Sequence, residues 1–163
     1  MDKHVFYYSF PILGETAIAE DKEGICAVFL ANGQDPPKLF TQNKFEVKET
    51  PLIKKAAEQL KEYFEGKRKE FTVPLSLNGT EFQQKVHNAL LTIPCGQTVS
   101  YKELAGKSGY PLAVRATGSA CGKNPLLILV PCHRCIASSG RLGGFSAGLE
   151  VKRGLLKFES NAK

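Results

Sequence analysis

The hydrophobic pattern of this chain changes character near the middle of its 163 residues. Short runs of β-branched and aromatic residues come first, separated by turn residues, and they cover Val5 to Phe10, Thr16 to Glu20 and Ile25 to Leu30. Farther along, apolar residues recur every three or four positions, which is the spacing of amphipathic helices. Because strands come first and helices later, the order predicts an α+β protein, within the wider class of mixed α/β folds, rather than alternating strands and helices.

The strand-like part is followed by one strong helix signal. Thr50 has the side chain of an N-cap, Pro51 suits the first helical position, and Gly66 ends the pattern. This helix is expected to cover a small antiparallel sheet. The pattern loosens before Asn78-Gly79, so we expect an N-terminal sheet-and-helix domain over residues 1–78 and a second domain over residues 79–163.

The second half predicts a mainly helical domain. Thr80-x-x-Gln83 and Ser100-x-x-Glu103 are capping boxes, each of which opens a helix. Gly109 ends the second of these helices, and Pro111 is expected to begin another, from Leu112 to about Gly122. Two short helices joined by a tight turn that contains glycine are the outline of a helix-turn-helix.

The last of these helices is unusual for a DNA-reading helix. Arg115 is its one long basic residue, among Ala, Gly, Ser and Thr, whereas major-groove readers carry several long polar side chains. Small side chains allow close approach of the backbone, which suits a shape-driven fit to a narrow groove. Tight packing against a neighbouring helix explains the same composition and stays open as an alternative.

Charge is divided unevenly between the two halves. Residues 1–78 contain 11 Lys and Arg against 12 Asp and Glu, whereas residues 79–163 contain 11 against 4, so the net charges are −1 and +7. A basic half beside a neutral half favours a polyanionic partner, most often nucleic acid. A role in solubility alone is the equal alternative.

The densest chemistry follows an apolar run from Leu126 to Val130, which is expected to be a strand. It leads into Pro131-Cys132-His133-Arg134. A thiol reacts as its thiolate, and a nearby cation or base raises the thiolate fraction. On an extended segment neighbouring side chains face opposite ways, so His133 would act on Cys132 through water or a distant partner.

Other interpretations compete for these cysteines. Cys132-x-x-Cys135 resembles a redox or zinc pair, but Cys95 and Cys121 lack the spacing of a second zinc pair. Buried structural thiols are favoured for Cys95, Cys121 and Cys135. For Cys132, spacing alone leaves a reactive and a structural role equally open.

Taken together, these motifs resemble the alkylguanine-DNA alkyltransferases, also called methylated-DNA–protein-cysteine methyltransferases. The similarity covers about Thr80 to Glu159. It includes the following segments: Tyr101-x-x-Leu104-Ala105, Arg115-Ala116-x-Gly118-x-Ala120, Asn124-Pro125, Pro131-Cys132-His133-Arg134, Gly143-Gly144-Phe145-Ser146 and Leu155-Leu156-x-x-Glu159. The first half resembles the family's small sheet-and-helix domain only in outline.

The resemblance implies DNA repair by direct, irreversible transfer of a methyl or alkyl group from guanine O6 to Cys132, once per molecule, with thymine O4 left open as a second substrate. The lesion would be reached from the minor groove after the nucleotide is flipped out of the stack. Arg115 would fill the gap, and Tyr101 would help to turn the nucleotide and give a proton to the leaving guanine. His133 and Glu159 would activate the thiol.

Further residues carry over from the same resemblance. Ala116, Ser119 and Asn124 are expected to serve DNA binding, Asn124 as the hinge after the recognition helix. Phe145, Ser146 and Cys135 are expected to form the pocket for the flipped base.

Partners and setting follow from the same reading. We expect duplex DNA with alkylated guanine as the partner of a monomer, with no metal and no organic cofactor. No apolar run approaches the ~20 residues that a bilayer needs. Five cysteines without an export signal favour the cytoplasm. A non-enzymatic protein that binds or senses alkylated DNA is the alternative from another functional class.

Overall fold

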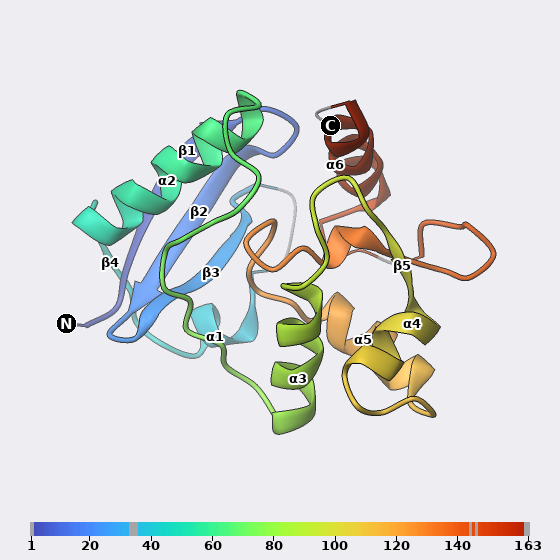
Figure 1. The fold of residues 1–163 in the computed structure, drawn as a ribbon. Helices are drawn as coiled ribbons and strands as arrows, with labels where there is room; N and C mark the ends of the chain where they lie inside the picture. Colours follow the sequence, from blue (N-terminus) through green and yellow to red (C-terminus); the bar gives the residue numbers. More distant parts are fainter. Residues whose placement is uncertain (1, 33–35, 144, 146, 162–163) are drawn as a thin grey trace. The chain divides into compact units, whose positions relative to one another are not determined.

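The computed structural model describes residues 2–32, 36–143, 145 and 147–161. The chain divides into two compact units, Met1–Leu77 and Asn78–Lys163, whose strands and helices are drawn in Figure 1. The first unit holds the main sheet and the second is mostly helical, so the α+β prediction is confirmed. Among the described residues, every helix is too short or too polar to serve as a membrane span.

The first unit is built on a four-stranded sheet with the order β3-β2-β1-β4. Its strands are β1 (His4–Phe10), β2 (Gly14–Asp21), β3 (Gly24–Leu30) and β4 (Glu46–Val47). The first three are antiparallel neighbours, as the sequence predicts, but β4 pairs with β1 in parallel. The expected purely antiparallel sheet is therefore wrong in this detail. A two-residue strand has no hydrophobic alternation of its own, and Glu46 and Val47 are both exposed.

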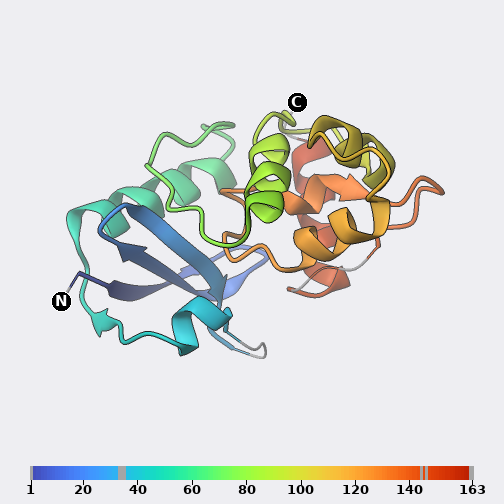
Figure 2. The ribbon, with the colours of Figure 1, turned by 90° about the horizontal axis from the view of Figure 1, so that it is seen from below.

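Both faces of this sheet are covered. Helix α2 (Pro51–Phe64) begins at Thr50, whose hydroxyl accepts the Ile53 N–H, and it lies against β1, β2 and β3. On the other face, α1 (Lys38–Thr41) supplies two apolar side chains to a cluster around Val5 and Phe29. Figure 2 shows the two helices on opposite sides of the sheet. The buried face of α2 consists of Ile53, Ala56, Ala57, Gln59, Leu60 and Tyr63.

The second unit begins with two helices whose starts the sequence predicts. Helix α3 (Glu81–Leu90) opens with the capping box of Thr80 and Gln83, and α4 (Tyr101–Lys107) opens with that of Ser100 and Glu103. In both boxes the two reciprocal hydrogen bonds are formed. A two-residue parallel pair, β5 (Val99–Ser100) with β6 (Cys135–Ile136), and the C-terminal helix α6 (Leu149–Asn161) complete the unit.

The helix-turn-helix consists of α4 and α5 (Val114–Gly122), which pack together. Helix α5 starts two residues later than the sequence suggests. The N–H of Ala113 donates to Tyr110 O at 2.9 Å, so Pro111 and Leu112 belong to the connecting turn. No side chain caps this helix, which removes the usual sequence marker of its start.

The apolar run from Leu126 to Val130 is not the expected strand. It forms a compact turn in which Ile128 adopts a left-handed φ of 66°. The Asn124 side chain holds this turn: it donates to Leu126 O at 3.2 Å and to Val130 O at 2.8 Å, and it accepts the Leu126 N–H at 2.9 Å. These bonds replace a strand ladder, and an apolar run by itself does not distinguish the two.

Candidate active site

Cys132 opens a single 3₁₀ turn, η1 (Cys132–Arg134), directly after the turn that Asn124 organises. The Asn124 Nδ2 that binds the turn also donates to Cys132 Sγ at 3.1 Å. The extended backbone expected at His133 is therefore replaced by 3₁₀ geometry. Asn124 is buried against the sulfur and not on the outer surface of the recognition helix.

The Cys132 thiol is nearly inaccessible, with 3% of the residue exposed. Burial raises its pKa to about 12, and the hydrogen bond from Asn124 and the charge of Lys152 oppose that rise. The resting sulfur is consequently a thiol at neutral pH. It needs a base at the moment of reaction, because the thiolate is the nucleophile.

A buried ion network lies beside the thiol. His133 Nε2 and Glu159 Oε2 are 2.8 Å apart, and Arg134 donates to both oxygens of Glu159 from Nε and Nη2 at 2.8 Å. Arg134 Nη1 also donates to Ile93 O at 2.6 Å. The network joins η1 to α6 through a bidentate pair, the strongest arrangement available to arginine and carboxylate.

The protonation states of this network follow from its geometry. Burial alone would raise the pKa of Glu159, but the bonds from Arg134 and His133 outweigh it and hold that pKa well below its ordinary value. Burial lowers the pKa of His133, against the opposing effect of Glu159. His133 is therefore neutral at pH 7. A carboxylate only accepts, so the proton sits on Nε2.

That tautomer leaves Nδ1 of His133 as an acceptor. Nδ1 is buried, and it has no hydrogen-bond partner among the described residues. An unprotonated ring nitrogen with a free lone pair, one residue from a thiol that must lose a proton, has the chemistry of a general base.

A second buried basic side chain of the site, Lys152, lies beside Cys135. Lys152 is fully buried and donates from Nζ to Cys135 O at 2.7 Å. Its Nζ also lies 5.8 Å from the ring centre of Tyr101 and 5.9 Å from that of Phe145, within range of a cation–π contact. Burial raises the pKa of Tyr101 to about 12, so its hydroxyl keeps its proton at neutral pH.

Two glycines lie against Tyr101, and one of them leaves the space that its hydroxyl occupies. A Cβ at Gly118 would lie 3.5 Å from the ring, and one at Gly143, where φ is +73°, would lie 2.5 Å from the hydroxyl oxygen. Gly143 is required here for both its left-handed backbone and its missing side chain.

The other residues singled out from the sequence lie in three settings. Arg115, Ala116 and Ser119 are exposed on α5, whereas Cys135 is buried in β6. Phe145 is half-buried. Ser146 lies outside the described residues.

The remaining thiols do not form a metal site. All five cysteines lie within the described residues and none forms a disulfide. Cys121 and Cys135 are hydrogen-bonded to each other, and this bond, together with burial, raises the pKa of Cys121. Among the described residues, no three His, Cys, Asp or Glu side chains are grouped as a metal site would require.

Family models match both units of this structure. The model described as "6-O-methylguanine DNA methyltransferase, DNA binding domain" matches residues 81–161, and the one described as "6-O-methylguanine DNA methyltransferase, ribonuclease-like domain" matches residues 4–77. The chain belongs to the O6-methylguanine DNA methyltransferase family. The resemblance noted in the sequence is thus confirmed and extends to the first half.

Individual members of the O6-methylguanine DNA methyltransferase family agree over most of their length. The chain is 45% identical over 148 residues to the constitutive methylated-DNA–protein-cysteine methyltransferase of Bacillus subtilis, with 90% of each chain covered. It is 40% identical over 152 residues to the methylated-DNA–protein-cysteine methyltransferase of Methanosarcina acetivorans, covering 91% of this chain and 94% of the relative. The crystal structure of Mycobacterium tuberculosis OGT in complex with DNA superposes with a TM-score of 0.87 at 37% identity, covering 98% of this chain and 94% of that one.

Two side chains of this methyltransferase site had no role in the sequence reading. Arg134 stands in the sequence only as part of the Pro131-Cys132-His133-Arg134 motif and Lys152 stands in no motif given above, yet both are buried and bonded to groups around Cys132. For Arg134, the available signal was Glu159, one of only four acidic residues in the basic half. For Lys152 the helical spacing to Leu155 and Glu159, which share its buried face of α6, was the only one.

Proposed function

We propose that this chain repairs DNA by moving a methyl or other alkyl group from O6 of guanine in duplex DNA to Sγ of Cys132. The activity is that of a methylated-DNA–protein-cysteine methyltransferase. The observation that carries the proposal is the Cys132 thiol, held at 3.1 Å by the Asn124 amide beside a neutral His133, in a chain of this family.

The transfer is a single displacement at carbon. A sulfur lone pair forms the S–C bond while the C–O bond breaks, and the electron pair of that bond leaves on guanine. The thiol proton passes to Nδ1 of His133, through a bridging water in the 3₁₀ geometry. Glu159 and Arg134 keep the imidazole in the accepting tautomer, as the orienting group of a nucleophile–base pair does.

The leaving guanine needs a proton, and Tyr101 is the proposed donor. Its hydroxyl is protonated at neutral pH, and Lys152 over the ring stabilises the phenolate that forms. The product is a thioether, which is no leaving group under these conditions. Each polypeptide therefore acts once.

Access to the sulfur requires a flipped nucleotide. Because Cys132 is 3% exposed, a base within the stack cannot reach it and has to rotate out of the helix. Arg115, on the exposed small-residue side of α5, is the proposed plug for the gap. Ala116 and Ser119 are the proposed contacts to the walls of the minor groove. We expect binding to fall with salt, since phosphate contacts dominate it.

The proposal includes the cellular location and the oligomeric state of the protein. Thiols without disulfides suit the reducing cytoplasm, and the protein acts there as a monomer without a cofactor.

Labelled substrate tests this function. An oligonucleotide duplex with one labelled methyl on guanine O6 is incubated with the full chain, which is then digested and mapped. We expect up to one label per chain, on the peptide that contains Cys132, and none in Cys132→Ser. Cys26→Ser is the matched control, because Cys26 is also buried but lies in β3, and it keeps the full yield. Label that stays on tightly bound DNA would identify a lesion-binding protein instead.

A further inference from the structure

The sheet of the first unit is open along one part of its edge. At the β3 edge, the Ile25 N–H donates to Pro74 O at 2.9 Å, and Ile25 O accepts the Ser76 N–H at 2.8 Å. At the β1 edge, β4 and its neighbours cover only the start, where Lys3 O and Val5 O each accept an N–H at 3.0 Å. Beyond Val5, no backbone group of the described chain is bonded to this edge.

The register shows which groups are open. In an antiparallel pair, alternate residues point their N–H and C=O toward the neighbour. Lys3 and Val5 point away from β2, toward β4, and so the same groups of Tyr7 and Ser9 point to the open side. Both residues are exposed. From Val5 to Phe10 the strand has no lysine, proline or charged residue, the usual protections of a free edge.

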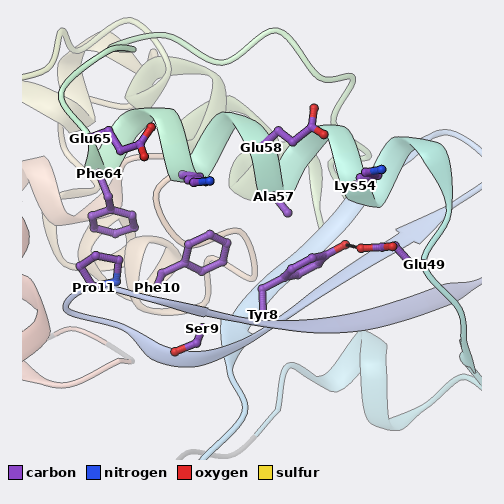
Figure 3. Close-up of a pocket in the computed structure, with 11 residues that line it drawn as sticks. Tyr8, Ser9, Phe10, Pro11, Glu49, Lys54, Ala57, Glu58, Phe64 and Glu65 are labelled. Atoms are coloured by element: carbon purple, nitrogen blue, oxygen red, sulfur yellow. Dashed lines mark hydrogen bonds between the residues drawn. The ribbon is translucent and has the colours of Figure 1, made fainter.

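A groove runs along this open stretch, between β1 and α2 (Figure 3). Its volume is about 490 Å³. Tyr8 and Phe10 form its β1 side, and the Phe10 and Phe64 rings stack with centres 6.0 Å apart. The helix side runs from Lys54 to Glu65, which is roughly 16 Å at the helical rise. An extended chain fills that length with about five residues.

Two of the carboxylates that line the groove, Glu49 and Glu58, act on Tyr8. The Tyr8 hydroxyl donates to Glu49 Oε2 at 2.5 Å, and the charges of Glu49 and Glu58 both act on Tyr8. Lys54 and Lys61 line the same groove. Among the described residues, however, neither carboxylate is in a salt bridge. A ligand that carries an apolar side chain and a cationic side chain would therefore match the aromatic and the acidic part of the groove.

We propose that the β1 edge and this groove bind an extended segment of a partner polypeptide, which joins the sheet as a further strand. The open N–H and C=O groups of Tyr7 and Ser9 select a peptide backbone, since only a strand satisfies both kinds. Alternate side chains of the segment enter the groove. An aromatic or aliphatic one lies against Phe10 and Phe64, and a Lys or Arg two positions away meets Glu49 and Glu58.

Peptide selection tests this proposal on the full chain. A random heptapeptide library displayed on phage is selected against the protein, and the enriched peptides are synthesised and titrated by calorimetry. We expect an apolar residue and a Lys or Arg spaced by two. N-methylation at alternate peptide positions should abolish binding, and N-methylation at the intervening positions should leave it intact, because only one set of N–H groups faces β1.

Two charge variants sharpen the result. Glu58→Lys should weaken the selected peptide by about tenfold. Glu70→Lys, the same change at an exposed site outside the groove, should not alter its affinity. Both variants should transfer alkyl groups at the normal rate, so this test is independent of the repair reaction. No enrichment, or binding indifferent to the N-methyl position, would overturn the proposal. Self-association of the chain that the peptide reverses would assign the edge to a second copy and also overturn it.

Discussion

The two units of this protein bury different kinds of polar group. In the first unit the buried polar side chains are neutral, namely Thr16, Thr50, Gln59 and Ser76. In the second unit they include every buried acidic, basic or histidine side chain of the described residues: His87, His133, Arg134, Lys152 and Glu159.

The two kinds of buried group differ in their energetic cost. A neutral group is satisfied by one or two hydrogen bonds, as Gln59 is by Thr72. A buried charge costs several kcal/mol of desolvation that pairing only partly returns. Four of the five charged or titrating groups contact Cys132, Cys135 or one another. The second unit therefore has the energetically less favourable interior, and the buried charges lie at the residues that the proposed transfer uses.

Of the variants considered, Glu159→Gln should have the largest effect on the buried charges of the second unit. It leaves Arg134 buried without its counter-charge and removes the carboxylate that orients His133. We expect the rate of transfer to fall about 100-fold and the free energy of unfolding to fall by about 3 kcal/mol. Single-turnover kinetics and denaturant unfolding measure the two effects.

The control is Glu20→Gln in the first unit, where Glu20 bonds His4 and Thr50. It should cost about 1 kcal/mol with no change in rate. An equal rate loss in both variants would contradict the role of Glu159.

The pH dependence should separate the two roles of this network. The depressed pKa of Glu159 means that the unfolded chain binds its proton first, so the stabilisation is present above about pH 4.5 and is lost as pH falls below it. The lowered pKa of His133 keeps the base neutral, so the rate should hold from about pH 8 down to 6.5. A rate already falling above pH 6.5 would count against His133 as the base.

Arg115→Ala should have the next largest effect, on duplex substrate only. If Arg115 fills the gap left by the flipped nucleotide, its loss should slow transfer from duplex DNA by about tenfold or more and leave reaction with the free modified base unchanged. Arg153→Ala removes the same charge from an exposed position on α6 and serves as the control. Equal losses on duplex and free base would remove Arg115 from the flipping step.

Gly143→Ala tests whether transfer depends on the position of the Tyr101 hydroxyl. The new Cβ would lie 2.5 Å from the Tyr101 hydroxyl oxygen at a left-handed φ, so the ring has to move. We expect roughly a tenfold slower transfer and a loss of about 2 kcal/mol. Gly140→Ala has the same left-handed strain, with φ at +88°, but nothing within 4 Å. It should cost about 1 kcal/mol with a normal rate, and a slow Gly140→Ala would mean that backbone strain alone explains both variants.

The smallest effect is expected from helix caps. Thr50→Ala in the first unit and Thr80→Ala in the second each remove an N-cap and should each cost about 1 kcal/mol. Thermal unfolding should show a shift of about 3 °C, with the rate per folded molecule unchanged. A slower rate in Thr50→Ala alone would give the first unit a part in the transfer.

Much of the fold was predictable because local interactions, such as helix N-caps and turns, determine where its helices and strands begin and end. Thr50, Thr80 and Ser100 each place a hydroxyl where the first free N–H groups of a helix need one, and the three long strands have clear turn residues between them. The Leu126–Val130 turn was not predictable, since its backbone bonds come from the side chain of Asn124. The parallel β4 has no pattern of its own.

Only some members of the site were predictable from the sequence: the buried contacts of Arg134 and Lys152 were not, and neither was the geometry around Cys132. The motif names Cys132 and His133, but the 3₁₀ turn that places them depends on tertiary contacts. The burial of Lys152 depends on Tyr101, Phe145 and Cys135 O, which come from three segments far apart in the chain. Lysine at a helical position gives no sign that its ammonium group is enclosed.

The side-chain amide of Asn124 holds the turn before Cys132 and also donates to the Cys132 sulfur. Because the two N–H groups of Asn124 Nδ2 are shared among Leu126 O, Val130 O and Cys132 Sγ, the sulfur that accepts the alkyl group moves whenever that turn moves. Redesign for bulkier lesions should therefore keep Asn124 and residues 126–130 intact and alter the enclosing walls, where a change in width leaves the point of attack undisturbed.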